Sequence, residues 1–165
     1  MRQSPLSALG LAIIGFCAWQ STPLGDAWRS SPFDRFGWLA FVIWAIPVFC
    51  PASVETRLPL RPTQHTALQG SALALALLGS LGSLNGLCYI GLACSMAALC
   101  PWGPRTAVWL AGAISWMPVF GYAMSQCLPN SLPNTAFVVS IFRLTSAVVA
   151  TSILLLPMRK KNQIQ

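Results

Sequence analysis

Charged residues are scarce in this chain: its 165 residues include ten Lys and Arg and three Asp and Glu. Together they make up 8% of the chain, whereas a soluble domain carries about 25% charged residues. A water-facing surface needs more charge than this, and 55% of the residues are hydrophobic. The composition therefore predicts one integral membrane domain over residues 1–165 and excludes a soluble globular protein.

The sequence also lacks the patterns of a metal or nucleic-acid site. None of the six cysteines forms a CxxC pair, and the single histidine, His65, has no neighbours that would orient it. Most cysteines lie within apolar runs, where cysteine behaves as a small hydrophobe. The basic residues stand at the ends of apolar runs instead of gathering on one face, as nucleic-acid binding requires. We therefore expect the lipid bilayer as a partner, and no metal, cofactor or nucleic acid.

The apolar runs predict an all-α polytopic membrane bundle of about six transmembrane helices. Their approximate ranges are residues 4–21, 36–52, 66–83, 86–102, 106–125 and 136–157. The first could be a signal peptide, but no A-x-A cleavage pattern follows it, so we favour a retained helix. Pro47 and Pro118 interrupt the second and fifth ranges, and each is expected to bend or end its helix.

No Asp, Glu, Lys or Arg occurs from residue 62 to residue 104, a stretch too long for a single helix. The glycines within residues 79–86 predict the turn of a helical hairpin there. Small residues recur every four positions on both expected helices, which allows their backbones to approach closely. The positions are Ala72, Ala76 and Ser80 on one helix and Gly91 and Ser95 on the other.

The distribution of Lys and Arg predicts the orientation. With both termini in the cytoplasm, the external side holds two basic residues, Arg29 and Arg35, which Asp26 and Asp34 neutralise. The cytoplasmic side then holds seven, namely Arg2, Arg57, Arg61, Arg105, Arg159, Lys160 and Lys161. The positive-inside rule favours this arrangement over its reverse. We therefore expect a multi-pass protein of the inner or plasma membrane with cytoplasmic termini.

Arg143 is the remaining basic residue, and it lies inside an expected span. Seven residues after residue 136, at 1.5 Å per residue, place it roughly 10 Å into the outer half of the bilayer. Its side chain can reach outward to water or point into the bundle. Because no acid lies within any expected span, we expect backbone carbonyls, lipid phosphate or the hydroxyls of Ser115, Ser140 and Thr145 as its partners.

The segment AWRSSPFDRFGWLAFVIWAIPV resembles the first external loop and following helix of the exosortase/archaeosortase family. These membrane cysteine transpeptidases process proteins that carry a C-terminal sorting signal. In one placement, Ala93-Cys94-Ser95 resembles the A-C-S of the catalytic motif and Arg143 resembles a later arginine. The resemblance then implies Cys94 as the nucleophile and Arg143 as the group that stabilises the thiolate or oxyanion. This chain departs from the motif at Met96, where the family has glycine.

A second placement matches the whole chain to only the amino-terminal part of that family. The WMP of the fifth expected span then resembles a helix that precedes the catalytic region. A length of 165 residues is short for the family and favours this placement. The first placement also departs from the family because the fifth span has no arginine and no histidine lies near the outer face. It implies a half-length relative or a partner subunit without the nucleophile.

Three functions are compatible with these observations. We favour a non-catalytic scaffold or accessory relative in membrane-associated protein sorting, whose partner is another membrane protein or a C-terminal sorting-signal helix. The second hypothesis is an active transpeptidase or protease that uses Cys94 and Arg143. The third is a small transporter, because interrupted helices and an intramembrane arginine occur along substrate pathways.

Overall fold

The computed structural model describes residues 8–49, 62–100, 103–128 and 134–155, and its regular structure there is entirely helical. A 3₁₀ helix, η2 (Gly112–Trp116), joins two of the α-helices. In chain order the α-helices are α1 (Ala8–Gln20), α2 (Pro23–Ser30), α3 (Gly37–Phe49), α4 (Pro62–Leu81), α5 (Asn85–Ala97), α6 (Pro104–Ala111), α7 (Pro118–Cys127) and α8 (Thr135–Leu155). The expected all-α class is confirmed for the described part of the chain.

Fewer helices than expected can cross a membrane as single rods. Within the described ranges, only α8 is long and apolar enough on its own. Two bent pairs meet the same criterion when taken together: α1 with α2, bent by 41°, and α6–η2 with α7, bent by 77°. The helices α3 and α5 are apolar but have 13 residues each. The described residues thus hold one helix able to span, or up to three if each bent pair is one span.

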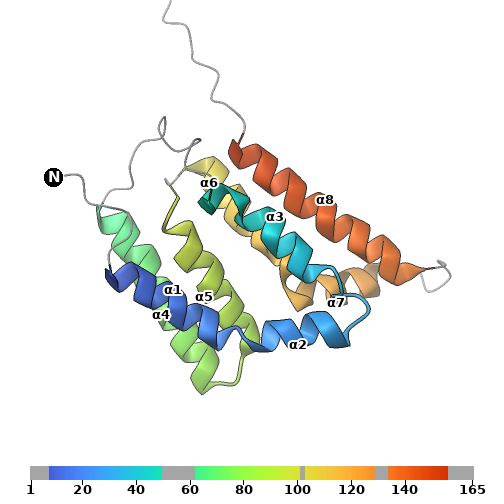
Figure 1. The fold of residues 1–165 in the computed structure, drawn as a ribbon, viewed down its shortest axis with the longest axis horizontal. Coiled ribbons are helices and arrows are strands. Elements are labelled where there is room, and N and C mark those ends of the chain that lie inside the picture. The colour runs from blue at the N-terminus through green and yellow to red at the C-terminus, as the bar shows by residue number, and fades with distance from the viewer. Residues whose placement is uncertain (1–7, 50–61, 101–102, 129–133, 156–165) are drawn as a thin grey trace, which may run out of the picture.

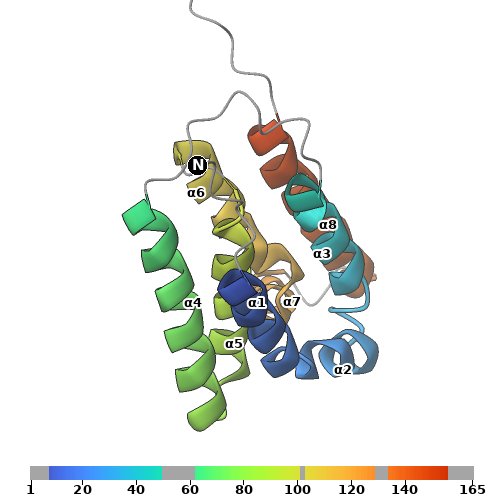
Figure 2. The same cartoon turned by 60° about the vertical axis from the view of Figure 1, so that its left-hand side comes forward.

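The helices pack in two groups that lie side by side (Figure 1). The first group consists of α1, α4 and α5, and the second consists of α3, α6, η2 and α8. Figure 2 shows the two groups from another side, with α2 and α7 at the same end of the molecule. The starts of α3 and α8 and the turn between α4 and α5 also lie towards this end (Figure 1).

Small residues set the distance between α4 and α5. A Cβ added to Gly91 would lie 2.9 Å from the carbonyl oxygen of Ala72 and 3.2 Å from the backbone nitrogen of Ala76. Both alanines are fully buried. The turn between the helices is made at Ser83, whose φ of 55° lies in the left-handed region. The expected hairpin and its small-residue contact are confirmed.

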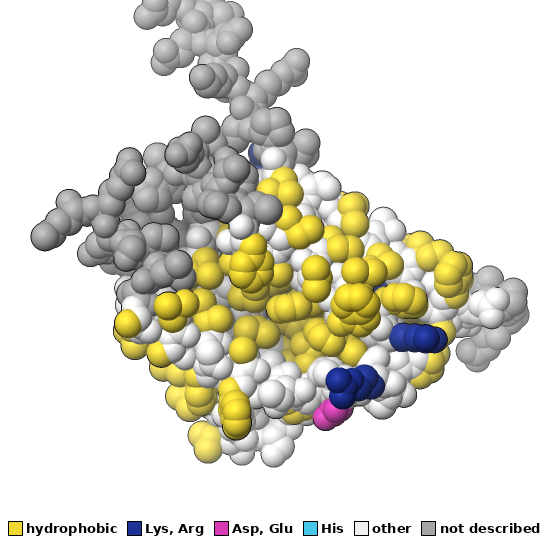
Figure 3. All heavy atoms as spheres, in the orientation of Figure 1, with side chains coloured by type: hydrophobic (Ala, Val, Ile, Leu, Met, Phe, Trp, Pro, Cys, Tyr) yellow, Lys and Arg dark blue, Asp and Glu magenta, His cyan; other side chains and the backbone are white. Residues whose placement is uncertain are grey.

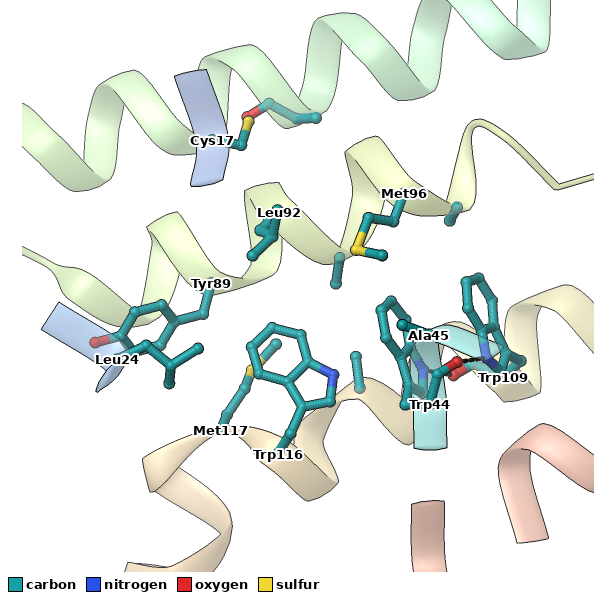
Figure 4. Close-up of a cluster of buried hydrophobic side chains, with 14 of the residues drawn as sticks. Cys17, Leu24, Trp44, Ala45, Tyr89, Leu92, Met96, Trp109, Trp116 and Met117 are labelled. Atoms are coloured by element: carbon teal, nitrogen blue, oxygen red, sulfur yellow. Dashed lines mark hydrogen bonds between the residues drawn. The ribbon is translucent and has the colours of Figure 1, made fainter. Parts of the chain in front are cut away.

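Aromatic side chains fill the space between the two groups (Figure 4). Trp44 of α3 and Trp109 of α6 are fully buried and lie on the side of the core opposite Leu92 and Met96 of α5. Their indole rings stack with centroids 4.3 Å apart and an interplanar angle of 1°. Each indole N–H donates to the other residue's backbone carbonyl, at 2.7 and 2.8 Å. This reciprocal pair holds α3 against α6.

Pro47 lies inside α3, which continues past it to Phe49. Because proline has no N–H, the carbonyl of Ile43, four residues earlier, loses its helical donor. The hydroxyl of Thr151 in α8 donates to this carbonyl at 3.0 Å. The proline therefore supplies an acceptor that joins α3 to α8.

Candidate functional site

A sharp break between η2 and α7 leaves backbone carbonyls outside the helical pattern. The 3₁₀ helix ends at Trp116, Met117 is extended with φ −77° and ψ 147°, and α7 begins at Pro118. The Trp116 carbonyl accepts a hydrogen bond from the indole of Trp28 at 3.0 Å. The Met117 carbonyl accepts one from Nη1 of Arg143 at 3.4 Å. Side chains from α2 and α8 thus supply the hydrogen-bond donors that these two carbonyls lack at the break, as buried backbone groups require.

Arg143 of α8 is fully buried and forms an ion pair with Asp34. Its Nη2 donates to Oδ1 of Asp34 and, at 3.4 Å, to the carbonyl of Phe33. The guanidinium carbon lies 5.4 Å from the centroid of the Phe120 ring, within cation–π range. With the Met117 carbonyl, the guanidinium is therefore held by an anion, two carbonyls and an aromatic face.

Asp34 reaches Arg143 because the turn between α2 and α3 folds inward. The Asp34 N–H donates to the Ser31 carbonyl at 3.1 Å, and the Gly37 N–H donates to the Asp34 carbonyl at 2.7 Å. These bonds hold the turn, and the Asp34 side chain is 8% exposed. Burial raises the pKa of the Asp34 carboxyl, while the charge of Arg143 and a hydrogen bond from Ser31 oppose that shift.

Gly121 provides the space that the ion pair occupies. It lies near the start of α7 and is buried. A Cβ at this position would collide with Oδ1 of Asp34 and lie 2.8 Å from Nη2 of Arg143. The site therefore joins three segments: the turn before α3, the start of α7, and α8.

The partner of Arg143 corrects the expectation from the sequence. Asp34 stands in a segment expected to be an external loop, so counting acids within the apolar spans missed it. Outward snorkelling is also wrong, since Arg143 is fully buried. Of the expected hydroxyl partners, Ser140 donates to the Ala136 carbonyl at 2.8 Å, and Thr145 is exposed. The backbone carbonyls were expected correctly.

Two further features of this segment were missed. Residues 23–30 were expected to be loop but form α2, which carries Trp28 to the break. Gly121 was not singled out, although a glycine three residues after a helix-breaking proline could have indicated a close approach. The proline itself was the signal in the sequence that pointed to the break.

Cys94 does not share this site. It lies on α5, which packs against α4, α1 and α6, whereas α8, which carries Arg143, packs against α3, α6, η2 and α7. Cys94 is half-buried, and no hydrogen bond or ion pair joins it to Arg143 in the described part of the chain. The two residues that the resemblance pairs are thus on different helix groups.

An open hollow of about 570 Å³ lies beside the ion pair. Polar side chains of the turn and of α7 line it, including Ser31, Asp34, Tyr122, Ser125 and Gln126. No group of three or more His, Cys, Asp or Glu that could hold a metal ion occurs among the residues that the structure describes.

The chain matches no protein-family model, and no curated protein or solved structure matches it either.

Proposed function

We propose that this chain is a multi-pass membrane protein that acts as a scaffold or accessory subunit and catalyses no reaction itself. The observation that carries this proposal is the environment of Arg143. Both terminal nitrogens of its guanidinium are engaged, with Asp34 and with two backbone carbonyls. Arg143 therefore acts as a structural charge that ties segments together: three of its five N–H groups donate to Asp34 and the two carbonyls, and Nε is buried with no hydrogen-bond partner among the described residues.

The exposed surface supports placement in a membrane. Large apolar side chains point outward along α3 and α8, and Figure 3 shows hydrophobic side chains spread over the face of the molecule where these helices lie. In water such a continuous apolar surface would promote association, whereas lipid matches it. Those residues are Trp38, Val42, Ile46, Phe49, Phe137, Ile141, Phe142, Val148 and Val149.

The topology that we propose has six spans with both termini in the cytoplasm. The end of α3, the starts of α4 and α6, and the end of α8 lie towards one end of the bundle (Figure 1). These helix ends adjoin the connections that carry the cytoplasmic Lys and Arg in this topology. Of those seven basic residues, Arg105 lies within the described ranges. The arrangement supports the orientation expected from the positive-inside rule.

The proposed biological context is membrane-associated protein sorting, on the basis of the resemblance of residues 27–48 to the exosortase/archaeosortase family. The separation of Cys94 from Arg143 favours the placement in which the chain lacks a nucleophile. Its partner in this proposal is another membrane protein or a C-terminal sorting-signal helix. Accordingly, Cys94→Ala should leave processing of a sorting-signal substrate unchanged, whereas loss of processing would favour the transpeptidase hypothesis.

Labelling and crosslinking in native membranes test the scaffold and its topology together. Cys127 is exposed at the end of α7 and serves as a native reporter after the other cysteines are replaced by alanine. A membrane-impermeant maleimide should label Cys127 in intact cells. In a chain whose Cys127 is also replaced by alanine, it should label Arg105→Cys only after lysis. Photo-crosslinking should recover a second membrane protein. Recovery of the monomer alone would contradict the scaffold, and the reverse labelling pattern would contradict the orientation.

One observation favours a transporter as a second candidate, namely the 77° break between η2 and α7. Discontinuous helices commonly form substrate sites in transporters. In this chain Trp28 and Arg143 already occupy the carbonyls of Trp116 and Met117. A flux assay on reconstituted protein with a panel of anions separates the two functions. The scaffold predicts no flux, whereas flux that Arg143→Ala abolishes would favour transport.

A further inference from the structure

A broad open groove of about 1210 Å³ lies between α2, the turn that follows it, and the first turn of α8. Arg29 and Arg35 both line it, and Ser30 and Ser31 lie between them in the chain and line it too. Guanidinium and hydroxyl groups are the donors that proteins commonly use for phosphate. The groove therefore has the chemistry of an anion site.

The inward turn of Asp34 leaves this surface more positive than the sequence suggests. By sequence, Asp26 and Asp34 balance Arg29 and Arg35. In the structure Asp34 is buried against Arg143, so Asp26 is the acid left to oppose two exposed arginines. Neither Arg29 nor Arg35 forms an ion pair with another described residue.

Apolar side chains form the remaining wall of the groove. Trp38 and Phe137 line it and are 51% and 64% exposed. They begin the apolar faces of α3 and α8. Figure 3 shows the basic side chains at the edge of the broad hydrophobic surface, beside a single acidic patch. This is the arrangement of a membrane–water interface, with tryptophan at the boundary and charge just beyond it.

We propose that this groove binds the headgroup phosphate of an anionic phospholipid. Arg29 and Arg35 would contact the phosphate, and the acyl chains would follow Trp38 and Phe137 along α8. The apolar wall favours a lipid over a soluble anion, because a soluble anion would leave that wall in contact with water. The inference rests on the membrane placement proposed above and goes beyond it, since a scaffold needs no particular lipid.

Lipid selectivity in reconstituted membranes tests this site. The full chain is placed in phosphatidylcholine vesicles with trace spin-labelled phosphatidylglycerol or spin-labelled phosphatidylcholine, and electron paramagnetic resonance gives each lipid's association with the protein. We expect a preference for phosphatidylglycerol of roughly fivefold for each arginine that contacts phosphate. The preference should fall as salt is raised. The double variant Arg29→Gln/Arg35→Gln should bind both lipids equally, whereas the matched control Asp26→Asn should keep the preference or increase it.

Each contrary result identifies what fails. Equal association of the two lipids with the unaltered chain overturns the site, as does an unchanged preference in the double variant. Displacement of the spin-labelled lipid by soluble glycerol phosphate at comparable affinity would remove the role of the apolar wall and overturn the lipid assignment.

Resistance to carbonate extraction is measured separately, to test whether the chain is inserted in the membrane. A chain that is extracted contradicts the membrane proposal, whereas an inserted chain without lipid preference contradicts this inference alone. If the double variant does not insert, the salt dependence of the unaltered chain decides.

Discussion

Asp34 and Arg143 are separated by 109 positions in the sequence and form an ion pair inside the helical bundle. The pair joins the turn before α3 to α8, and through the Met117 carbonyl it also holds the start of α7. Two charges removed from water are tolerated when they neutralise each other and hydrogen bonds satisfy their other polar atoms. Here the carbonyls of Phe33 and Met117 accept from the guanidinium, while its Nε has no partner among the described residues. One guanidinium therefore joins three segments at this end of the molecule.

Replacing one partner of the ion pair should destabilise the protein more than expected from the effect of replacing both partners together. We expect Arg143→Met or Asp34→Leu alone to lower the free energy of unfolding by about 3–5 kcal/mol, because each leaves an uncompensated buried charge. The double variant Asp34→Leu/Arg143→Met should lose clearly less than the sum of the two. Unfolding of the purified chain in detergent micelles, followed by tryptophan fluorescence, measures these differences. Asp26→Leu is the control for loss of an exposed acid, and additive losses in the double variant would contradict the pairing.

Gly121 should not tolerate any side chain. The methyl group of Gly121→Ala would meet Asp34 and Arg143 directly, so we expect a loss of about 1–3 kcal/mol from overpacking. Gly70, in the middle of α4, is the matched control because nothing lies within 4 Å of the position of its added Cβ. Gly70→Ala should be neutral or stabilising by up to about 1 kcal/mol, since alanine favours helix. Thermal unfolding of both variants compares them, and equal effects would show that Gly121 is not sterically restricted.

The apolar runs indicate where the helices lie because burial in lipid or in a core follows composition along the chain. The stretch without charges predicts the α4–α5 hairpin, and Gly91 predicts its close contact. The 77° break is harder to predict: Pro118 indicates a bend, but Trp28 and Arg143, from helices distant in the sequence, donate to the carbonyls at the break. No local pattern encodes those two partners.

The inward turn of Asp34 shows most clearly what the sequence cannot reveal. A charge count by segment assigns Asp34 to a neutral external loop, since its neighbour Arg35 has the opposite sign. Which of two adjacent charged residues turns inward depends on the position of Arg143 across the bundle and on the space at Gly121. Both are properties of the packed structure. Because Asp34 turns inward to Arg143, it does not pair with Arg29 or Arg35, and both arginines stay exposed at the surface.

The reciprocal pair of Trp44 and Trp109 should be cooperative. Trp44→Phe removes the donor to the Trp109 carbonyl and reduces the stacked area, so we expect a loss of about 1–3 kcal/mol. Trp109→Phe should cost a similar amount, and the second substitution should cost less once the first is present, because the two rings contact each other. Unfolding in micelles gives the double-mutant cycle. Trp19→Phe, at an indole that is 75% exposed, is the control and should have little effect. If the losses of unfolding free energy from the two substitutions are additive, the two buried indoles do not act cooperatively.

Pro47 in α3 should determine how much the hydrogen bond from Thr151 contributes to stability. In the unaltered chain, Thr151→Val removes the hydroxyl that donates to the Ile43 carbonyl and should cost about 1–3 kcal/mol. Pro47→Ala restores an N–H four residues after Ile43, and this N–H can donate to the same carbonyl. Thr151→Val should therefore cost less in the Pro47→Ala background than in the unaltered chain. The four proteins of this cycle are compared by unfolding in micelles, with Thr145→Val, at an exposed position of the same helix, as the control. An equal cost in both backgrounds would show that the proline does not create the acceptor that joins α3 to α8.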